Sequence, residues 1–251
     1  MQPLLISRAK TPMAVLAAIL GIVISSTQAG AGDIAQRDVI GFSASGGHFA
    51  FEEYGIQDGS GFAYSNIYII DVTTDSWLPG TPVRVRLEDD TAGLESARAQ
   101  ARSMAGPALD QLAIDASPYH AASNPVTETS TDPYHVTINP RPVLPAIDDP
   151  ISFTLVPYSL TGSETCEPFG QMKGFKLSVE RLSETGSAVL IHKDTAIPQS
   201  RGCPLDYRIA DIFTFFPQSG GPVFATLIQI IAVGFEGPDG RFMAVTGTLP
   251  D

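Results

Sequence analysis

The sequence has no apolar run long enough to cross a bilayer as a helix. The segment 13–24 (MAVLAAILGIVI) holds twelve residues, whereas a membrane-spanning helix needs about 20. It follows the basic residues Arg8 and Lys10 and precedes an A-x-A site that ends at Ala31. This order is typical of a secretory signal peptide rather than a membrane anchor. We therefore expect cleavage of residues 1–31 near Ala31, and a periplasmic or secreted mature protein with no stable membrane insertion.

Cysteine is nearly absent, and its scarcity limits the redox chemistry. Cys166 and Cys203 are the only two, with no C-x-x-C pair and no cysteine at the cleavage site. A catalytic dithiol and a lipoprotein anchor are therefore not supported. In an oxidising compartment an even cysteine count favours one disulfide over two free, buried thiols. A Cys166–Cys203 bridge would stabilise the fold by about 4 kcal/mol in the chain-entropy view.

Basic residues are few. The chain has 15 Lys and Arg against 27 Asp and Glu, and residues 1–31 contain two of the basic side chains and no acidic one. The mature chain therefore has 13 basic side chains and a formal charge of −14. Such a surface repels nucleic-acid phosphates and anionic lipid headgroups. We expect no nucleic-acid binding, and the acidity gives only weak support to cation binding.

Catalytic, metal and cofactor motifs are also missing. The four histidines lie far apart, and residues 41–45 (GFSAS) lack the second glycine of a nucleophile elbow. Three acidic pairs occur, Glu52–Glu53, Asp89–Asp90 and Asp148–Asp149. Because neighbours on a strand point to opposite faces, the first pair cannot serve one site. We expect no cofactor and no metal, and a non-enzymatic role is favoured.

Short strands dominate what is present. Apolar stretches, alternating or continuous, are separated by turns rich in glycine, aspartate and proline. The turn sequence at 44–47 (ASGG) predicts an antiparallel hairpin. The expected strands are 39–43, 48–54, 66–72, 83–87, 151–157, 174–182, 188–192, 206–216, 223–235 and 241–247. The fold class is therefore mainly β, with antiparallel strands and hairpins.

One main α-helix is expected between residues 90 and 106. Leu94 and several alanines recur there at helical spacing, and residues 89–91 offer capping oxygens. Pro107 should end or kink the helix, with residues 108–114 adding a further turn or two. The alanine-lined face predicts close packing against a sheet.

Prolines concentrate between residues 117 and 150. Because proline cannot donate to a β-ladder, we expect a long proline-rich loop there, with 134–138 as its strand candidate. The mature chain 32–251 then forms a single β-rich domain, or two subdomains joined by this loop. An irregular β-propeller is an alternative fold, since 42–51 and 235–245 both combine a phenylalanine, a glycine-containing turn and an apolar strand.

The candidate ligand loop follows the first hairpin. Glu53, Tyr54, Asp58 and Tyr64 lie in or beside the glycine-rich stretch 55–65. Functional loops often combine glycine with aromatic and carboxylate side chains. An ordinary hairpin extension is the alternative interpretation.

Several stretches together resemble a known family. They are residues 41–72 (GFSASGGHFAFEEYGIQDGSGFAYSNIYIIDV), the W-x-P-G-T-P-V-R-V-R-L pattern at 77–87, Gly202-Cys203-Pro204, and 234–247 (GFEGPDGRFMAVTG). On these residues the mature chain resembles the predicted secreted proteins of domain of unknown function 2259. The resemblance implies an exported protein of a Gram-negative bacterium, and it assigns no catalytic residue.

Three functional hypotheses follow. The leading one is a non-enzymatic periplasmic interaction or binding module, with a periplasmic protein as its partner. The second is a small-ligand or cation-binding protein that uses the Glu53–Tyr64 loop. The third is a carboxylate-dependent hydrolase. They differ in whether acids such as Glu53, Asp58 and Asp239 converge in a cleft.

Overall fold

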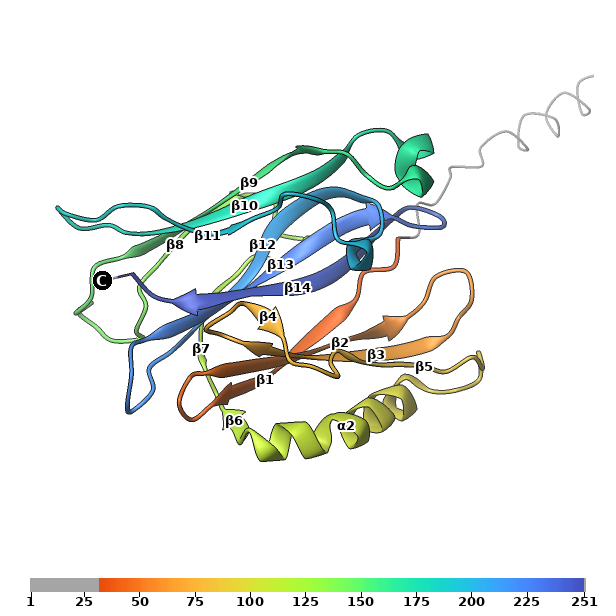
Figure 1. Ribbon diagram of the computed structural model, residues 1–251, viewed down its shortest axis with the longest axis horizontal. Helices are drawn as coiled ribbons and strands as arrows, with labels where there is room; N and C mark the ends of the chain where they lie inside the picture. Colours follow the sequence, from red (N-terminus) through yellow and green to blue (C-terminus); the bar gives the residue numbers. More distant parts are fainter. Residues whose placement is uncertain (1–31, 251) are drawn as a thin grey trace, which may run out of the picture. The chain divides into compact units, whose positions relative to one another are not determined.

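Three antiparallel β-sheets and one long helix make up residues 32–250, the part that the computed structural model describes (Figure 1). The predicted signal peptide, residues 1–31, lies outside the described residues. The expected mainly β fold, with antiparallel hairpins and one main helix, is confirmed.

The first sheet is built from residues that precede the proline-rich stretch. Its strand order is β4-β3-β2-β1-β6, and β5 also pairs with β3. The predicted turn at 44–47 joins the first two strands, and Gly46 adopts a φ of 75°, where a side chain would be strained. The strands are β1 (Gln36–Ser43), β2 (His48–Ile56), β3 (Ala63–Asp71), β4 (Ser76–Trp77), β5 (Val83–Arg86) and β6 (Ile114–Ala116).

The other two sheets have four strands each. The middle sheet has the order β14-β13-β12-β7, from β7 (Tyr119–Ser123), β12 (Pro204–Phe215), β13 (Val223–Val233) and β14 (Pro238–Thr248). The outer sheet has the order β11-β10-β9-β8, from β8 (His135–Ile138), β9 (Ile151–Leu160), β10 (Met172–Arg181) and β11 (Val189–Lys193). The middle sheet therefore has one long edge strand, β14, and one short one, β7, whereas both edge strands of the outer sheet are short.

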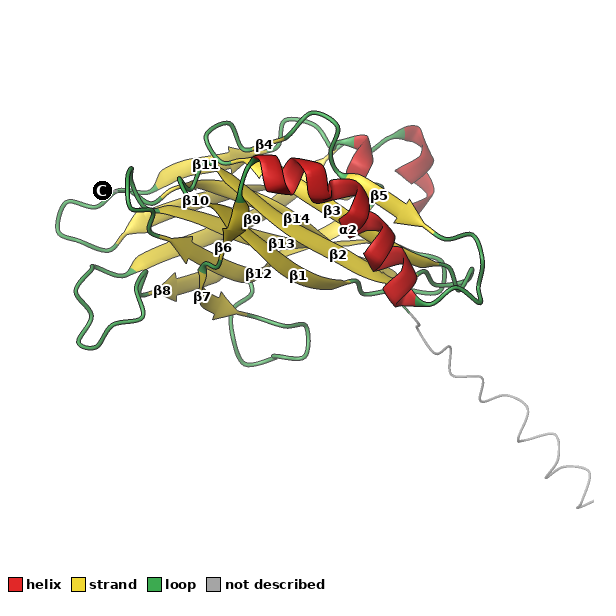
Figure 2. Cartoon of the chain, turned by 90° about the horizontal axis from the view of Figure 1, so that it is seen from below, coloured by secondary structure: helices red, strands yellow, loops and turns green. Residues whose placement is uncertain are grey.

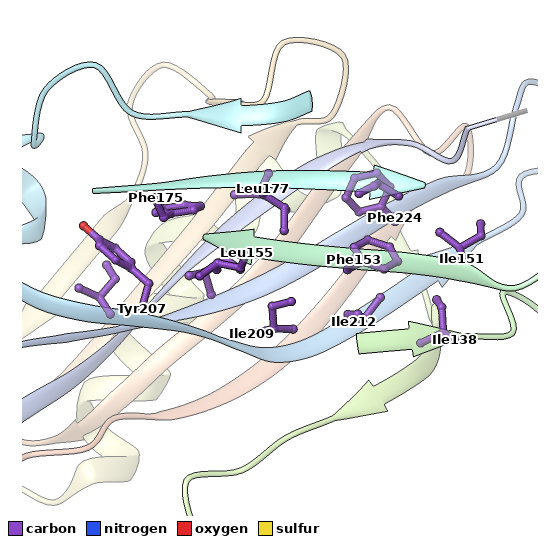
Figure 3. Packing of buried hydrophobic residues seen from close by; sticks show 14 of the residues in the cluster. Ile138, Ile151, Phe153, Leu155, Phe175, Leu177, Tyr207, Ile209, Ile212 and Phe224 are labelled. Carbon is purple, nitrogen blue, oxygen red and sulfur yellow. The ribbon is translucent and has the colours of Figure 1, made fainter. Parts of the chain in front are cut away.

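The middle sheet lies between the other two and is apolar on both faces (Figure 1). Phe153 of the outer sheet packs on Phe224 in one core (Figure 3). Phe49 of the first sheet shares a second core with Leu227. A strand that is buried on both sides needs no polar face. This explains the nearly continuous apolar run of β13.

The helix α2 (Leu94–Gln111) covers the other face of the first sheet (Figure 2). Its buried residues are Ala97, Ala101 and Ala105, and they share a core with Ile67 and Ile69 of β3. Small side chains let the helix axis lie close to the strands. The expected packing of an alanine-lined face on a sheet is confirmed.

The start of α2 differs from the expectation. The N-cap is Gly93, which makes no side-chain capping bond, so capping by residues 89–91 is wrong. Asp89 instead accepts the backbone N–H of Thr91 in the preceding turn, because a short acidic side chain bonds readily to its own local backbone. The expected further turn after Pro107 is present: the helix continues through this exposed residue to Gln111, since water can satisfy the carbonyl group that loses its partner there.

The proline-rich stretch 117–150 supplies one edge strand to each of two sheets. The predicted strand at 134–138 is confirmed as β8. The strand β7 was not predicted, because YHAAS carries no clear alternation, and its pairing with β12 is decided by tertiary structure.

The β-propeller alternative is wrong. Propeller blades surround a central axis, whereas these sheets stack face to face and share the middle sheet. The similarity of 42–51 and 235–245 is a local feature of two hairpins, one in the first sheet and one in the middle sheet.

The predicted disulfide between Cys166 and Cys203 is confirmed, with a Cα–Cα separation of 5.4 Å. Cys166 lies in the 3-10 helix η1 (Glu164–Phe169), and Cys203 follows a second one, η2 (Gln199–Arg201). The bridge therefore anchors the loop between β11 and β12 to the outer sheet.

Candidate binding cleft

A cleft of about 480 Å³ follows the free edge of the middle sheet. The edge strand β14 forms its floor, β3, β4 and β5 of the first sheet form one wall, and β11 with the η2 segment forms the other. We call this the β14 cleft. Its lining residues are Glu53, Asn66, Tyr68, Ile70, Asp75, Trp77, Arg84, His192, Pro198, Ser200, Arg201, Ile230 and Arg241 to Ala244.

The first wall combines aromatic surface with a free positive charge. Trp77 is 42 % exposed, and its ring lies 5.8 Å from that of Tyr68 between centroids. The Arg84 guanidinium lies 5.6 Å from the centre of the Trp77 ring. Arg84 belongs to none of the ion pairs formed within residues 32–250. It is therefore available to an anionic group in the cleft.

The floor exposes a short piece of unpaired strand edge. Alternate residues of β14 point their N–H and C=O groups away from β13. Of these, Gly240 bonds to the backbone of Asp33 and Ala35. The N–H of Phe242 donates to Glu53 at 2.5 Å, and that of Thr246 donates to Asp75 at 2.8 Å.

Between these two capped positions lies Ala244. No hydrogen bond from the described part of the chain reaches its outward N–H or C=O group. Ala244 also lines the cleft and is partly exposed. The floor therefore offers one donor and one acceptor side by side.

Glu53 is fixed in place and does not act as a free acid. It is 1 % exposed, and its second oxygen accepts a hydrogen bond from Asn66 at 3.1 Å. Burial raises the pKa of Glu53, because charge is costly away from water. Its two oxygens are thus engaged in joining β2 and β3 to the edge of β14.

His192 joins the two walls. Its Nε2 lies 2.9 Å from Asp194, its Nδ1 lies 3.8 Å from Asp75, and its ring stacks on Phe175. Burial alone would lower the pKa of His192, but the hydrogen bonds to the two carboxylates outweigh it and raise the pKa. Because both ring nitrogens face carboxylates, His192 has no free nitrogen to serve as a base toward Ser200 in the same cleft.

Asp194 anchors the second wall. Burial would raise the pKa of Asp194, but hydrogen bonds from His192, Arg201 and the Phe175 N–H lower it to about 2. Arg201 also bonds to the hydroxyl of Tyr207 at 3.3 Å. The η2 segment is thus held by ion pairing as well as by the nearby disulfide.

The four residues of the predicted ligand loop do not form one site. Glu53 lines the β14 cleft, and Tyr64 lies beside it, under the Arg241 guanidinium. Tyr54 is on the opposite face of the sheet, 3.7 Å below the guanidinium of Arg98. Asp58 lies in the β2–β3 turn, where it accepts the N–H of Gly59.

The members of the first acidic pair, Glu52 and Glu53, also lie apart. Glu52 faces α2 and bonds to Arg98 and Arg102, while Glu53 faces the cleft, as the strand alternation predicts. Burial would raise the pKa of Glu52, but the two arginines outweigh it and lower the pKa. Asp239 lies near Arg241 and bonds to the N–H of Asp33. Among residues 32–250, no three His, Cys, Asp or Glu side chains gather as a metal-ligand group.

Of the residues that line the cleft, the sequence predicted only Glu53 as a site residue and missed, among others, Asp75, Trp77, Arg84 and Ala244. The alternation of residues 83–87 indicates that Arg84 and Arg86 share one face of their strand. The alternation does not indicate that this face lies opposite the edge of β14. Ala244 carries no signal at all, because its contribution is a backbone position at a sheet edge.

Comparison with known protein families places the chain in one of them. A family model described as predicted secreted protein (DUF2259) matches residues 50–248, and the chain belongs to that family. Searches of curated proteins and of solved structures find no match. None of the helices in residues 32–250 is long and apolar enough to span a membrane.

Proposed function

We propose that the protein is an exported, non-enzymatic binding module that holds a small ligand in the β14 cleft. One observation carries the proposal. An exposed tryptophan, an unpaired arginine and an open strand position converge in a space of about 480 Å³. Ligand pockets typically have such volumes and combine apolar surface with a few polar groups.

The state of the acids and of the histidine supports binding rather than catalysis. Glu53 bonds to the Phe242 N–H and to Asn66, and Asp194 bonds to three donors. His192 has a carboxylate at each nitrogen. A general acid or base must exchange a proton with its substrate, and these groups are engaged in holding the walls together.

Export supports a periplasmic location for this binding. The family is described as predicted secreted, and the chain has one disulfide and no free cysteine among its described residues. The expected signal peptide at residues 1–31 points the same way. N-terminal sequencing of the protein from its host would test the location and the cleavage near Ala31.

The single tryptophan of the chain makes the proposal testable. Trp77 lies in the cleft, so its emission should change when a ligand enters. We would titrate the mature protein with sugars, amino acids, short peptides and divalent ions, and follow both emission and melting temperature. The Arg84→Ala variant should weaken binding of an anionic hit, while Lys176→Ala, on the exposed side of β10, should not. If no compound changes either signal, the proposal fails.

A periplasmic protein partner is the second candidate. The β8–β9 loop exposes Leu144 to 95 % and Ile147 to 67 %, and apolar side chains at a loop tip favour a contact with another protein. Crosslinking in periplasm should recover a partner that is lost with Leu144→Asp and kept with Val126→Asp. Recovery of the same proteins with both variants would contradict this candidate.

A further inference from the structure

We propose that the ligand of the β14 cleft is a short peptide with a free C-terminal carboxylate. One peptide unit would pair with the backbone of Ala244, and the carboxylate would bind Arg84. This inference rests on the proposed binding function and adds the chemical class of the ligand.

The open backbone groups of Ala244 favour a ligand that contains a peptide unit. Its outward N–H and C=O groups lie in the cleft without a partner among the residues described. The complement of a donor and an acceptor at strand spacing is the C=O and N–H of one amino-acid residue, as in an antiparallel ladder. Recognition by main-chain pairing at a sheet edge is an established mode of peptide binding.

The two carboxylate caps keep the ligand short. Glu53 covers the N–H of Phe242, and Asp75 covers that of Thr246. These positions are four residues apart, or about 13 Å at roughly 3.3 Å per residue. A long strand would have to displace both acids and lay its carbonyl groups against them. Charged side chains at a sheet edge are a common barrier to such pairing.

The charges of the cleft favour an anionic end. Arg201 is held by Asp194 and Arg241 by Asp33, which leaves Arg84 as the unpaired cation of the lining. Arg84 projects from β5 opposite Asn66 of β3. A guanidinium binds a carboxylate through two parallel hydrogen bonds, which gives orientation as well as affinity.

The aromatic wall accommodates a ligand side chain. Trp77 is partly exposed, Tyr68 lies against it, and Ile70 also lines the cleft. Successive side chains of an extended peptide point to opposite sides. A residue paired with Ala244 therefore directs a neighbouring side chain toward this wall, where aromatic surface contributes to binding.

Four probes separate the two recognition elements. N-acetyl-Ala-Ala carries amides and a carboxylate, and its C-terminal amide lacks the carboxylate. N-acetylglucosamine offers an amide without a carboxylate, and succinate offers carboxylates without an amide. We expect N-acetyl-Ala-Ala to change the Trp77 emission and to shift the Ala244 amide signal in a ¹H–¹⁵N spectrum. The C-terminal amide should bind at least tenfold more weakly, because a charge-assisted bond is lost.

A matched pair of proline variants tests the strand edge. Ala244→Pro removes an outward N–H that makes no bond within residues 32–250, and proline is tolerated at such edge positions. It should weaken N-acetyl-Ala-Ala binding by about tenfold or more. Thr248→Pro removes another outward N–H of β14, outside the cleft, and should leave binding unchanged. Arg84→Gln, which leaves Ala244 intact, should abolish the preference for the free carboxylate.

The outcomes distinguish this inference from the proposed function. If N-acetylglucosamine or another compound binds and the peptides do not, the cleft is a binding site and the peptide inference is wrong. Tighter binding of a ten-residue extended peptide than of N-acetyl-Ala-Ala would also overturn it. If Ala244→Pro fails to fold, the shift of the Ala244 amide signal in the wild-type protein and the result for Arg84→Gln decide whether the peptide inference holds. If no probe or library compound binds, both proposals fall.

Discussion

Neighbouring glutamates on the two faces of the first sheet have pKa values shifted in opposite directions. Glu52 and Glu53 follow each other on β2 and are 0 % and 1 % exposed. Glu52 meets the guanidinium groups of Arg98 and Arg102, which lower its pKa against the effect of burial. Glu53 meets a backbone N–H and an amide, and burial raises its pKa.

The difference shows what each face contributes. On the α2 face, Glu52 is paired with two arginines of the helix, so neither of its oxygens remains free for a ligand. On the cleft face, the acid caps one position of β14, and Asp75 caps another. The backbone between these caps stays open, and that opening is the candidate site.

Replacing Glu52 should give the largest effect. Glu52→Gln removes the buried charge that Arg98 and Arg102 share, and it should destabilise the protein by about 3 kcal/mol, because an ion pair loses one partner. Chemical denaturation would measure the change. The loss should shrink as the pH falls through the lowered pKa of Glu52, because wild type then loses the same interaction. A pH-independent loss would contradict the assignment.

The contrast also shows what a sequence can predict. Strand alternation places Glu52 and Glu53 on opposite faces, and alanine spacing predicts the packing of α2, because both depend on local geometry. The bond from Phe242 to Glu53 spans 189 residues of sequence, and no local pattern encodes it. The strand β7 and the open edge at Ala244 were missed for the same reason, since tertiary pairing decides them.

Overfilling the α2 face should have the next largest effect. Ala101 is fully buried against the first sheet. Ala101→Leu should destabilise the protein by about 2 kcal/mol, because extra methylene groups force the helix away from the strands. Ala99→Leu, on the exposed side of the helix, is the control. The Trp77 emission of the folded variant should match wild type if the two faces are independent, and a shifted spectrum would show that they are coupled.

A smaller effect is expected at His192, on the far wall of the cleft. His192→Gln should cost about 1 kcal/mol at pH 6, because a charge-assisted bond to Asp194 is lost. A raised histidine pKa contributes stability that is fully present below its ordinary value and disappears as the pH rises through the raised value. The variant and wild type should therefore converge at alkaline pH in thermal denaturation. A gap that persists at pH 9 would mean that packing on Phe175 dominates.

Glu53→Gln should change the stability least. It is also the most direct test of the difference between the two faces, because it is the same substitution as Glu52→Gln, one residue further along β2. The glutamine oxygen can still accept the Phe242 N–H, so we expect a loss of at most about 0.5 kcal/mol at acidic pH. The raised pKa of Glu53 means that wild type loses stability as the pH rises from the ordinary glutamate value to the raised one. The variant lacks this loss, so its relative stability should improve with rising pH, opposite to the trend at Glu52. Parallel trends in denaturation midpoints would show that the two faces do not differ as proposed.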